Sequence, residues 1–194
     1  MMEDESNTSC EEKGSELPPG IPIDWEAWLA TQGPRLLLFA RQQARREHEA
    51  EDILQDALVK LVRKVESGAL PRIPECWAAY VYKVIHSLAI NYGKKTDLRL
   101  IREGEAYMES EHIESSPWLQ SESDLDALKK DIETRLRDMP SKFSEVVILR
   151  IWGDLTFREI AETLDIPLNT VTSRYRYGIA HLRKSVSETA EPQS

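Results

Sequence analysis

The sequence predicts an all-α protein made of two small helical domains joined by an acidic flexible linker, the second domain a helix-turn-helix. Three observations predict this fold. Apolar residues recur at helical spacing through most of the chain, no alternating strand pattern or hairpin turn appears, and a capped helix followed by a tight turn lies near the C-terminus. We expect a disordered acidic tail at 1–23, a first domain at 24–96, a linker at 97–123, a second domain at 124–186 and a tail at 187–194.

The first domain is predicted to hold four helical segments. The first begins at Asp24, a good N-cap, and is expected to end at Gly33-Pro34, because Pro34 suits the first turn of a second segment. A strong amphipathic helix follows, then a rigid proline-containing connector and a further helix. Their expected ranges are about 47–65, 71–74 and 75–94.

The linker is predicted from composition, because residues 97–124 carry eight acids and only two arginines and are rich in serine. Helical spacing resumes at Asp124 and stops at Met139-Pro140. It then continues to Gly153, with apolar residues at most positions between 143 and 151. Each domain therefore has enough apolar residues for a modest core of three or four helices.

Residues 154–184 are predicted to form the helix-turn-helix. Thr156 and Glu159 have the spacing of a capping box, and Asp165-Ile166-Pro167 breaks the helix that follows. A second helix is expected from about 168 to 184. Its apolar positions, expected to be buried, are Leu168, Val171, Tyr175, Ile179 and Leu182. Its other face is polar and basic, as a helix that reads DNA requires.

The charge distribution limits how the chain meets DNA. The net charge is −9, yet residues 167–186 hold four Lys or Arg and no acid. Phosphate neutralisation supplies most nonspecific DNA binding, so we expect modest affinity for the free chain and a need for a partner.

Several classes of protein are not favoured by the composition. Cys10 and Cys76 form no disulfide framework or zinc spacing, the four histidines are scattered, and we expect no metal site, cofactor or catalytic residue. No signal peptide and no apolar run long enough to cross a membrane is apparent, so we expect a cytoplasmic protein without membrane insertion.

Two segments in this order resemble one known family. They are AEDILQDALVKL at 50–61, which fits an acidic-Asp-x-x-Gln-acidic pattern, and MPSKFSEVVILRIWGDLTFREIAETLDIPLNTVTSRYRYGIAHLRK at 139–184. The chain resembles an alternative sigma factor of bacterial RNA polymerase, of the extracytoplasmic-function (ECF) group within the sigma-70 family. The resemblance covers about residues 24–95 and 124–186. It implies a promoter-specificity subunit that binds core polymerase and promoter DNA, with an anti-sigma factor as its expected regulator.

The resemblance implies a polymerase-binding face on the helix at 47–65. This face would contact the clamp helices of the largest polymerase subunit, and the second domain would meet the flap of the second-largest subunit. The implied clamp contacts are Asp52, Gln55, Asp56, Val59 and Arg63. Without the resemblance these residues read as a solvated helix face.

The resemblance also implies that the helix at 75–94 and the loop at 66–74 bind the unpaired non-template strand of the −10 promoter element, where a base is flipped into a pocket. The implied contacts are Trp77, Tyr80, Lys83, His86, Ser87, Asn91, Lys94 and Lys95. This chain departs from the family at His86-Ser87, where an Arg-Asn pair is common, and at Asn91, where an Asp is common. The departures bear on which base is preferred.

The second domain is expected to place its last helix in the major groove of the −35 element. The base-edge candidates are Thr172, Ser173, Arg176 and Tyr177, and the phosphate candidates are Arg158, Thr170 and Arg174, with Asn169 on the same polar face.

Two alternatives stay open from the residues alone. An autonomous helix-turn-helix regulator predicts a dimerisation seam or a receiver domain, and neither is visible. A helical enzyme using Asp52, Asp56 and His86 lacks a nucleophile or a metal-ligand cluster.

Overall fold

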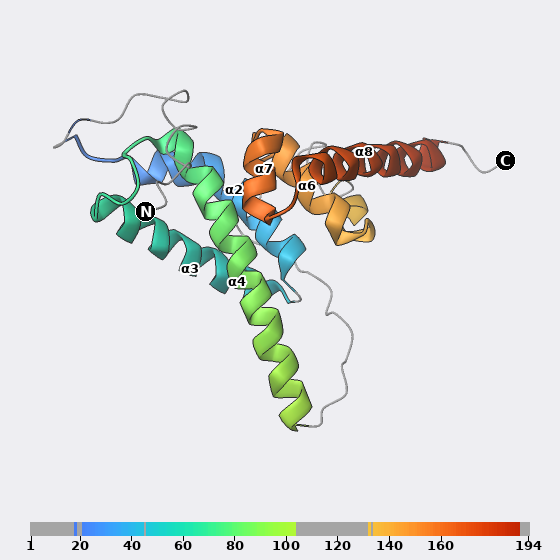
Figure 1. Ribbon diagram of the computed structural model, residues 1–194, viewed down its shortest axis with the longest axis horizontal. Helices are drawn as coiled ribbons and strands as arrows, with labels where there is room; N and C mark the ends of the chain where they lie inside the picture. The colour runs from blue at the N-terminus through green and yellow to red at the C-terminus, as the bar shows by residue number, and fades with distance from the viewer. Residues whose placement is uncertain (1–17, 19–20, 45, 104–131, 133, 191–194) are drawn as a thin grey trace.

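The computed structural model describes residues 18, 21–44, 46–103, 132 and 134–190, with no side chains described at 47, 94–103 and 185–190. Throughout these ranges the regular structure is helical and no strand occurs, so the predicted all-α class is confirmed. The main helices are α2 (Trp25–Gln43), α3 (Glu47–Glu66), α4 (Pro74–Glu103), α6 (Ser141–Ile151), α7 (Phe157–Leu164) and α8 (Leu168–Ala190) (Figure 1).

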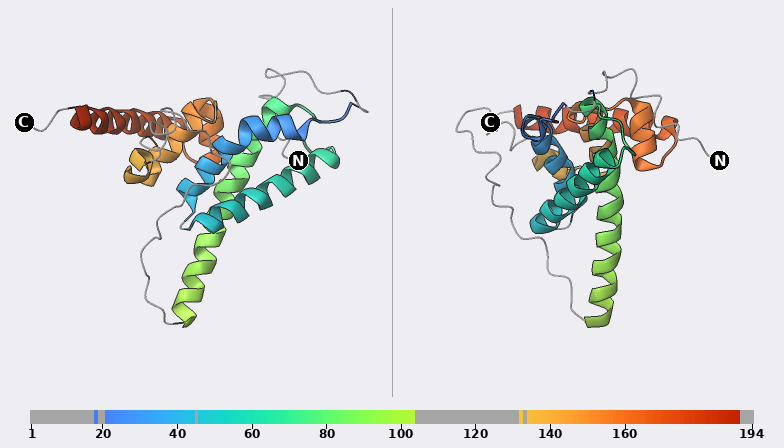
Figure 2. Two further views of the ribbon diagram at one scale, coloured as in Figure 1. Left: turned by 180° about the vertical axis from the view of Figure 1, so that it is seen from behind. Right: turned by 90° about the vertical axis from the view of Figure 1, so that its left-hand side faces the viewer.

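The helices form two lobes that lie against each other. In the first lobe α2, α3 and α4 pack on one another, and in the second α6, α7 and α8 do so. The lobes meet where α2 contacts α6 and α4 contacts α7. The C-terminal half of α4 extends away from the other helices, and α8 extends from the second lobe (Figures 1 and 2).

The first lobe is held by aromatic and aliphatic side chains from all three helices. Phe39 of α2 and Tyr82 of α4 are fully buried and meet edge to face, with ring centroids 5.3 Å apart. Ile53 and Leu61 of α3 are also fully buried in this core. These residues belong to one contiguous apolar cluster that also contains Leu149 of the second lobe. The predicted separate cores are therefore joined across the lobe contact.

The predicted break at Gly33-Pro34 is wrong, because α2 runs through both residues. Proline inside a helix removes one backbone hydrogen bond and costs about 3 kcal/mol. Residues on both sides of Pro34 are buried, Trp28 before it and Leu36 to Ala40 after it. Burial of this many apolar side chains, each worth about 1.5–3 kcal/mol, outweighs the cost. The predicted cap at Asp24 is confirmed, since its Oδ1 accepts from the amide of Ala27 at 2.9 Å.

Two helices continue past their predicted ends. Helix α4 was expected to stop near Lys94 but runs to Glu103, into the range predicted as linker. Gly93 does not end it, because one glycine in a helix costs only about 1 kcal/mol and good helix formers follow. Helix α8 was expected to stop near Lys184 but runs to Ala190. The rest of the predicted linker, 104–123, and nearly all of the predicted N-terminal tail lie outside the described residues.

Candidate nucleic-acid interface

The helix-turn-helix has the geometry that its sequence predicts. The Glu159 amide donates to Oγ1 of Thr156 at 3.2 Å, and the Thr156 amide donates to Oε2 of Glu159 at 2.8 Å, which closes the capping box of α7. Helix α7 ends at Leu164, and the residue that caps it, Asp165, has a left-handed φ of 52°. The chain then turns into α8 at Leu168, and the position of α8 follows from this short connection.

Helix α8 exposes the side predicted to read DNA, and its other side is only partly buried. Val171 is buried as predicted, Tyr175, Ile179 and Leu182 are half-buried, and the predicted base-edge candidates point to solvent. Gly178 is buried against Val147 and Phe143 of α6. The exposed candidates are Thr172, Ser173, Arg176 and Tyr177. Leu168 was expected to be buried, but its side chain is 46% exposed because it occupies the first residue of α8, beyond the α6 contact.

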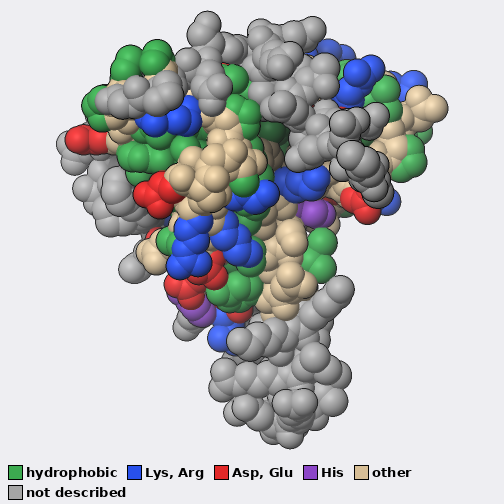
Figure 3. All heavy atoms as spheres, turned by 60° about the vertical axis from the view of Figure 1, so that its left-hand side comes forward, with side chains coloured by type: hydrophobic (Ala, Val, Ile, Leu, Met, Phe, Trp, Pro, Cys, Tyr) green, Lys and Arg blue, Asp and Glu red, His purple; other side chains and the backbone are tan. Residues whose placement is uncertain are grey.

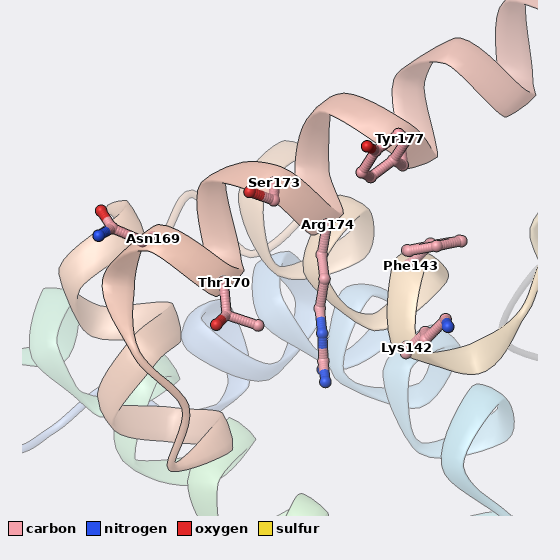
Figure 4. A pocket seen from close by; sticks show the side chains of 7 residues that line it. All are labelled: Lys142, Phe143, Asn169, Thr170, Ser173, Arg174 and Tyr177. Carbon is pink, nitrogen blue, oxygen red and sulfur yellow. The ribbon is translucent and has the colours of Figure 1, made fainter.

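The exposed face of α8 borders a hollow of about 480 Å³ against the start of α6 (Figure 4). Tyr177 and Phe143 lie with their rings 6.0 Å apart, and the Lys142 ammonium sits 5.0 Å from the Phe143 ring centroid. Arg176 sits 5.5 Å from the ring of Tyr177. The residues that line the hollow are Lys142, Phe143, Asn169, Thr170, Ser173, Arg174 and Tyr177. Lys142 and Phe143 were not singled out from the sequence, because they lie on a different helix whose register against α8 is a tertiary property.

The other predicted phosphate contacts differ in their surroundings. Arg158 on α7 and Asn169 on α8 are exposed, and Thr170 is half-buried. Arg174 has a protein partner: its Nη1 lies 2.9 Å from Oε1 of Glu145 on α6. Its side chain turns from α8 toward the interior (Figure 4). The sequence did not point to Glu145, a carboxylate only 9% exposed within an apolar run.

Burial and nearby polar groups act in opposite directions on the pKa of the Glu145 carboxyl. Removal from water raises its pKa above the ordinary value, and Arg174 beside it acts in the opposite direction. The Gln43 side chain, from α2 of the first lobe, also favours the charged form. Glu145 thus lies where α2, α6 and α8 meet.

On α4 the predicted −10 contacts are not equivalent. Trp77 is fully buried, so the expectation that it touches DNA is wrong; its ring packs between Trp25 and Trp28. Lys83, Ser87 and Asn91 are exposed along one side of the helix. Lys94 and Lys95 continue α4, with side chains outside the described ones.

Tyr80 and His86 are half-buried on α4. The Lys64 ammonium of α3 lies 5.8 Å from the Tyr80 ring centroid, so the end of α3 stands beside this face of α4. Burial lowers the pKa of His86 below 6.5, because a desolvated imidazole resists protonation. A neutral imidazole offers bases a hydrogen-bonding group rather than a fixed positive charge.

The predicted polymerase-binding side of α3 is exposed along its length. Asp52, Gln55, Asp56, Val59 and Arg63 all lie at the surface, and Val59 is 47% exposed. The phenol of Tyr92 on α4 donates to Oδ2 of Asp56 at 3.2 Å. On the face drawn in Figure 3, basic and acidic side chains lie interspersed with apolar ones.

No group of three or more potential metal ligands occurs among the side chains that the structure describes. Within the same ranges no helix is both long and apolar enough to cross a membrane.

Comparison with known families matches both lobes. A family model described as "Sigma-70 region 2" matches residues 29–99, and one described as "Sigma-70, region 4" matches residues 135–184; together they cover more than half of the chain. The first match contains α3 and most of α4, and the second contains α6, α7 and most of α8.

Curated proteins of similar sequence are named as RNA polymerase sigma factors. The ECF RNA polymerase sigma factor SigW of Bacillus subtilis is 26% identical over 154 residues, which cover 73% of this chain and 77% of that protein. The RNA polymerase sigma factor SigV of the same species is 29% identical over 136 residues, which cover 70% of this chain and 75% of that protein.

One solved structure has a similar fold. It is the sigma factor RpoE of Bartonella quintana in complex with the anti-sigma factor NepR, with a TM-score of 0.62 and 20% identity over 84% of this chain and 97% of the other.

Proposed function

The chain belongs to the sigma-70 family of bacterial RNA polymerase sigma factors, in its extracytoplasmic-function group, and on that basis we propose which surface binds each partner. The function itself is that of an RNA polymerase sigma factor, which directs the polymerase to promoter −10 and −35 elements and promotes initiation. The pairing of a region 2 lobe with a helix-turn-helix lobe on one chain carries this conclusion. An autonomous helix-turn-helix regulator would leave the region 2 match unexplained.

We assign −35 reading to the exposed face of α8. Thr172, Ser173, Arg176 and Tyr177 are positioned to meet base edges in the major groove, which admits a helix. Arg158 and Lys142 stand on neighbouring helices, where phosphates flank the groove. Arg174, already paired with Glu145, holds α8 against α6 in this proposal.

We assign −10 recognition to the exposed side of α4 and the loop that precedes it. Lys83, Ser87 and Asn91 face solvent together, and the half-buried Tyr80 lies on the same helix. Aromatic rings beside cations suit unpaired bases. His86, neutral by burial, differs from the arginine common in the family and is expected to change which base is preferred.

We assign the core-polymerase contact to α3. Its exposed side combines acids, an amide, an apolar residue and an arginine, a mixture suited to a protein surface rather than to DNA. The partner would be the clamp helices of the largest subunit, with the second lobe meeting the flap of the second-largest subunit. An anti-sigma factor is a further expected partner, since the solved neighbour is bound to one. We expect a cytoplasmic subunit with no catalysis of its own.

The test is reconstitution with core polymerase. Full-length chain added to purified core should direct initiation at a set of sites that share −10 and −35 sequences, as read by sequencing transcript starts. The double variant Asp52→Ala with Gln55→Ala should fail to assemble with core yet keep its melting temperature, because exposed substitutions usually change stability by less than about 0.5 kcal/mol. Glu75→Ala, exposed on α4, is the matched control. Start sites scattered without shared elements would refute the assignment.

A further inference from the structure

The segment that joins α3 to α4 is anchored at its first end by a Schellman motif. Gly68 has a left-handed φ of 71°, which glycine adopts without steric cost. Its amide donates to the Val65 carbonyl at 3.1 Å, and the Ala69 amide donates to the Lys64 carbonyl at 3.0 Å. The end of α3 therefore fixes the direction in which the chain leaves the helix.

Two tryptophans anchor the other end of the segment. The Trp77 indole Nε1 of α4 donates to the carbonyl of Pro71 at 2.8 Å. The Trp28 indole Nε1 of α2 donates to the carbonyl of Pro74 at 3.0 Å. Trp77 is fully buried and Trp28 is 8% exposed, so water does not compete freely for these carbonyls. Proline also restricts φ at both carbonyl-bearing residues.

Ring contacts hold the two indoles in place. Trp25 stacks on Trp77 with centroids 4.8 Å apart and planes 24° from parallel, and Trp28 meets Trp77 at an angle of 61°. For Trp25 no indole hydrogen bond occurs among the described residues, which makes it a packing partner only. Ile73, between the two anchored prolines, is 5% exposed.

The anchored segment presents an exposed tip. Ser67, Gly68 and Ala69 face solvent, whereas residues 70–73 are half-buried or buried. The tip follows directly on α3, whose Lys64 lies over the ring of Tyr80 on α4. The tip and the exposed side of α4 therefore border the same region of the surface.

We propose that Trp28 and Trp77 are positioning residues for recognition of the unpaired −10 strand. Their indole N–H groups hold the Pro71 and Pro74 carbonyls, and through them the tip at 67–69, in the orientation that reads the strand. Neither side chain touches DNA. This inference rests on the proposed role of α4 and its loop at the −10 element.

The experiment compares three conservative variants in full-length chain assembled with core polymerase. Trp77→Phe and Trp28→Phe remove an indole N–H and keep an aromatic ring, and Trp25→Phe is the matched control that removes no hydrogen bond seen in the structure. The probes are single-stranded oligonucleotides with the preferred −10 sequence and with each single-base change. The measured quantity is the affinity ratio between preferred and changed bases.

Trp77→Phe is expected to lower this ratio about ten-fold at one or two positions, the effect of losing about one buried hydrogen bond. Trp28→Phe should also lower the affinity ratio, and Trp25→Phe should leave the ratio within about two-fold of the parent value. Affinity for core should stay unchanged in all three. If Trp77→Phe assembles poorly with core, the affinity ratio of Trp28→Phe tests the proposal instead.

Three results would overturn the proposal. They are unchanged ratios in both hydrogen-bond variants, an equal loss in Trp25→Phe, and a uniform loss of affinity for every oligonucleotide together with weaker core binding. The parent holoenzyme serves as a separate check. If it showed no preference among the oligonucleotides, the proposed −10 role itself would fail, whatever the tryptophans do.

Discussion

At the scale of single residues, Arg174 illustrates how a buried partner changes the expected role of a basic residue on α8, the helix proposed to read DNA. Sequence pattern groups Arg174 with Arg176, since both lie on α8 among polar residues. The structure separates them, because Arg174 pairs with Glu145 and Arg176 is exposed. The guanidinium of Arg174 is therefore committed to a protein carboxylate, whereas that of Arg176 faces solvent on the side proposed to meet DNA.

Arg174→Ala should therefore act mainly on stability. Removing it leaves the buried Glu145 carboxylate without its cationic partner, and we expect a loss of about 2–3 kcal/mol in unfolding free energy, less than for a fully buried pair because Arg174 is partly exposed. Arg176→Ala, measured in the same urea titration, should change stability by less than about 0.5 kcal/mol. The double variant Glu145→Met with Arg174→Met should recover much of the loss.

The same variant distinguishes positioning from phosphate contact. A phosphate-binding arginine contributes about one unit to the slope of log affinity against log salt. We expect Arg174→Ala holoenzyme to keep the parent slope on −35 DNA. A slope lower by one unit, with unchanged unfolding free energy, would place Arg174 on a phosphate instead.

His86 gives the first lobe a pH dependence of known sign. Its Nδ1 is buried without a partner among the described residues, and burial lowers its pKa. Below about pH 6.5 the unfolded chain takes up this proton more readily than the folded chain, so stability falls as pH falls. His86→Gln, which cannot be protonated, should show a smaller loss of unfolding free energy between pH 7.5 and 5.5. Equal losses in the two proteins would show that His86 ionises as freely when folded as when unfolded.

At the scale of elements, the approach of α8 to α6 depends on one glycine. A Cβ built on Gly178 would lie 2.5 Å from Cγ2 of Val147, a buried and stiff side chain, and 3.4 Å from the Phe143 carbonyl oxygen. The two helices therefore pack at a distance that leaves no room for a methyl group.

Two glycine-to-alanine substitutions should have opposite signs. Gly178→Ala should destabilise the protein by about 1–2 kcal/mol through overpacking. Gly93→Ala, in α4, adds a Cβ that would meet nothing within 4 Å, and it should stabilise the protein by about 0.4–1 kcal/mol. Urea unfolding of both variants provides the measurement. Stabilisation by both would mean that α6 and α8 separate easily and do not fix each other.

Local signals predicted several helix boundaries. The capping box at Thr156, the turn at Asp165 and the cap at Asp24 follow from short-range chemistry and are confirmed by the structure. Gly33-Pro34 misled the prediction, because burial on both sides of the proline is a tertiary effect that outweighs a local break.

The site was predictable only where exposure follows helical phase. The exposed sides of α3 and α8 were predicted in this way. Trp77 and Arg174 were placed on DNA because their types suit it, but one is buried under Trp25 and the other pairs with a residue 29 positions away. No sequence spacing predicts such partners, since they depend on how the helices pack.

At the scale of the whole molecule, the contact between the lobes is incompatible with the proposed simultaneous reading of the −10 element by α4 and the −35 element by α8. The elements are named by their distance from the start site, so they lie about 25 base pairs, or ~85 Å, apart along straight DNA at ~3.4 Å per base pair. Helix α7 touches α4 and leads directly into α8. Its eight residues span about 12 Å, which places the start of α8 within a few tens of ångströms of α4.

The chain between the lobes is long enough to let α4 and α8 reach promoter elements ~85 Å apart. Fully extended, residues 104–131 span at most about 95 Å. The contact itself contains polar groups that water can satisfy after separation. Among them are the Glu145 carboxylate beside Gln43 and the hydroxyl of Tyr82, which is buried without a hydrogen-bond partner among the described residues. Contacts of this kind between domains are expected to open when a partner binds the separated form better.

We therefore predict that the lobes are docked in the free chain and separate in the promoter-bound holoenzyme. Fluorophores on Lys60→Cys in α3 and His181→Cys in α8, both exposed, would report the distance in a Cys10→Ser background, in which the remaining Cys76 is buried. Energy transfer should be high in the free chain and fall strongly on addition of core polymerase and promoter DNA. A pair within the first lobe, Lys60→Cys with Glu75→Cys, should keep its transfer throughout. Low energy transfer in the free chain would show that the lobes do not dock. Undiminished transfer on the promoter would show that one holoenzyme does not place α4 and α8 on elements ~85 Å apart.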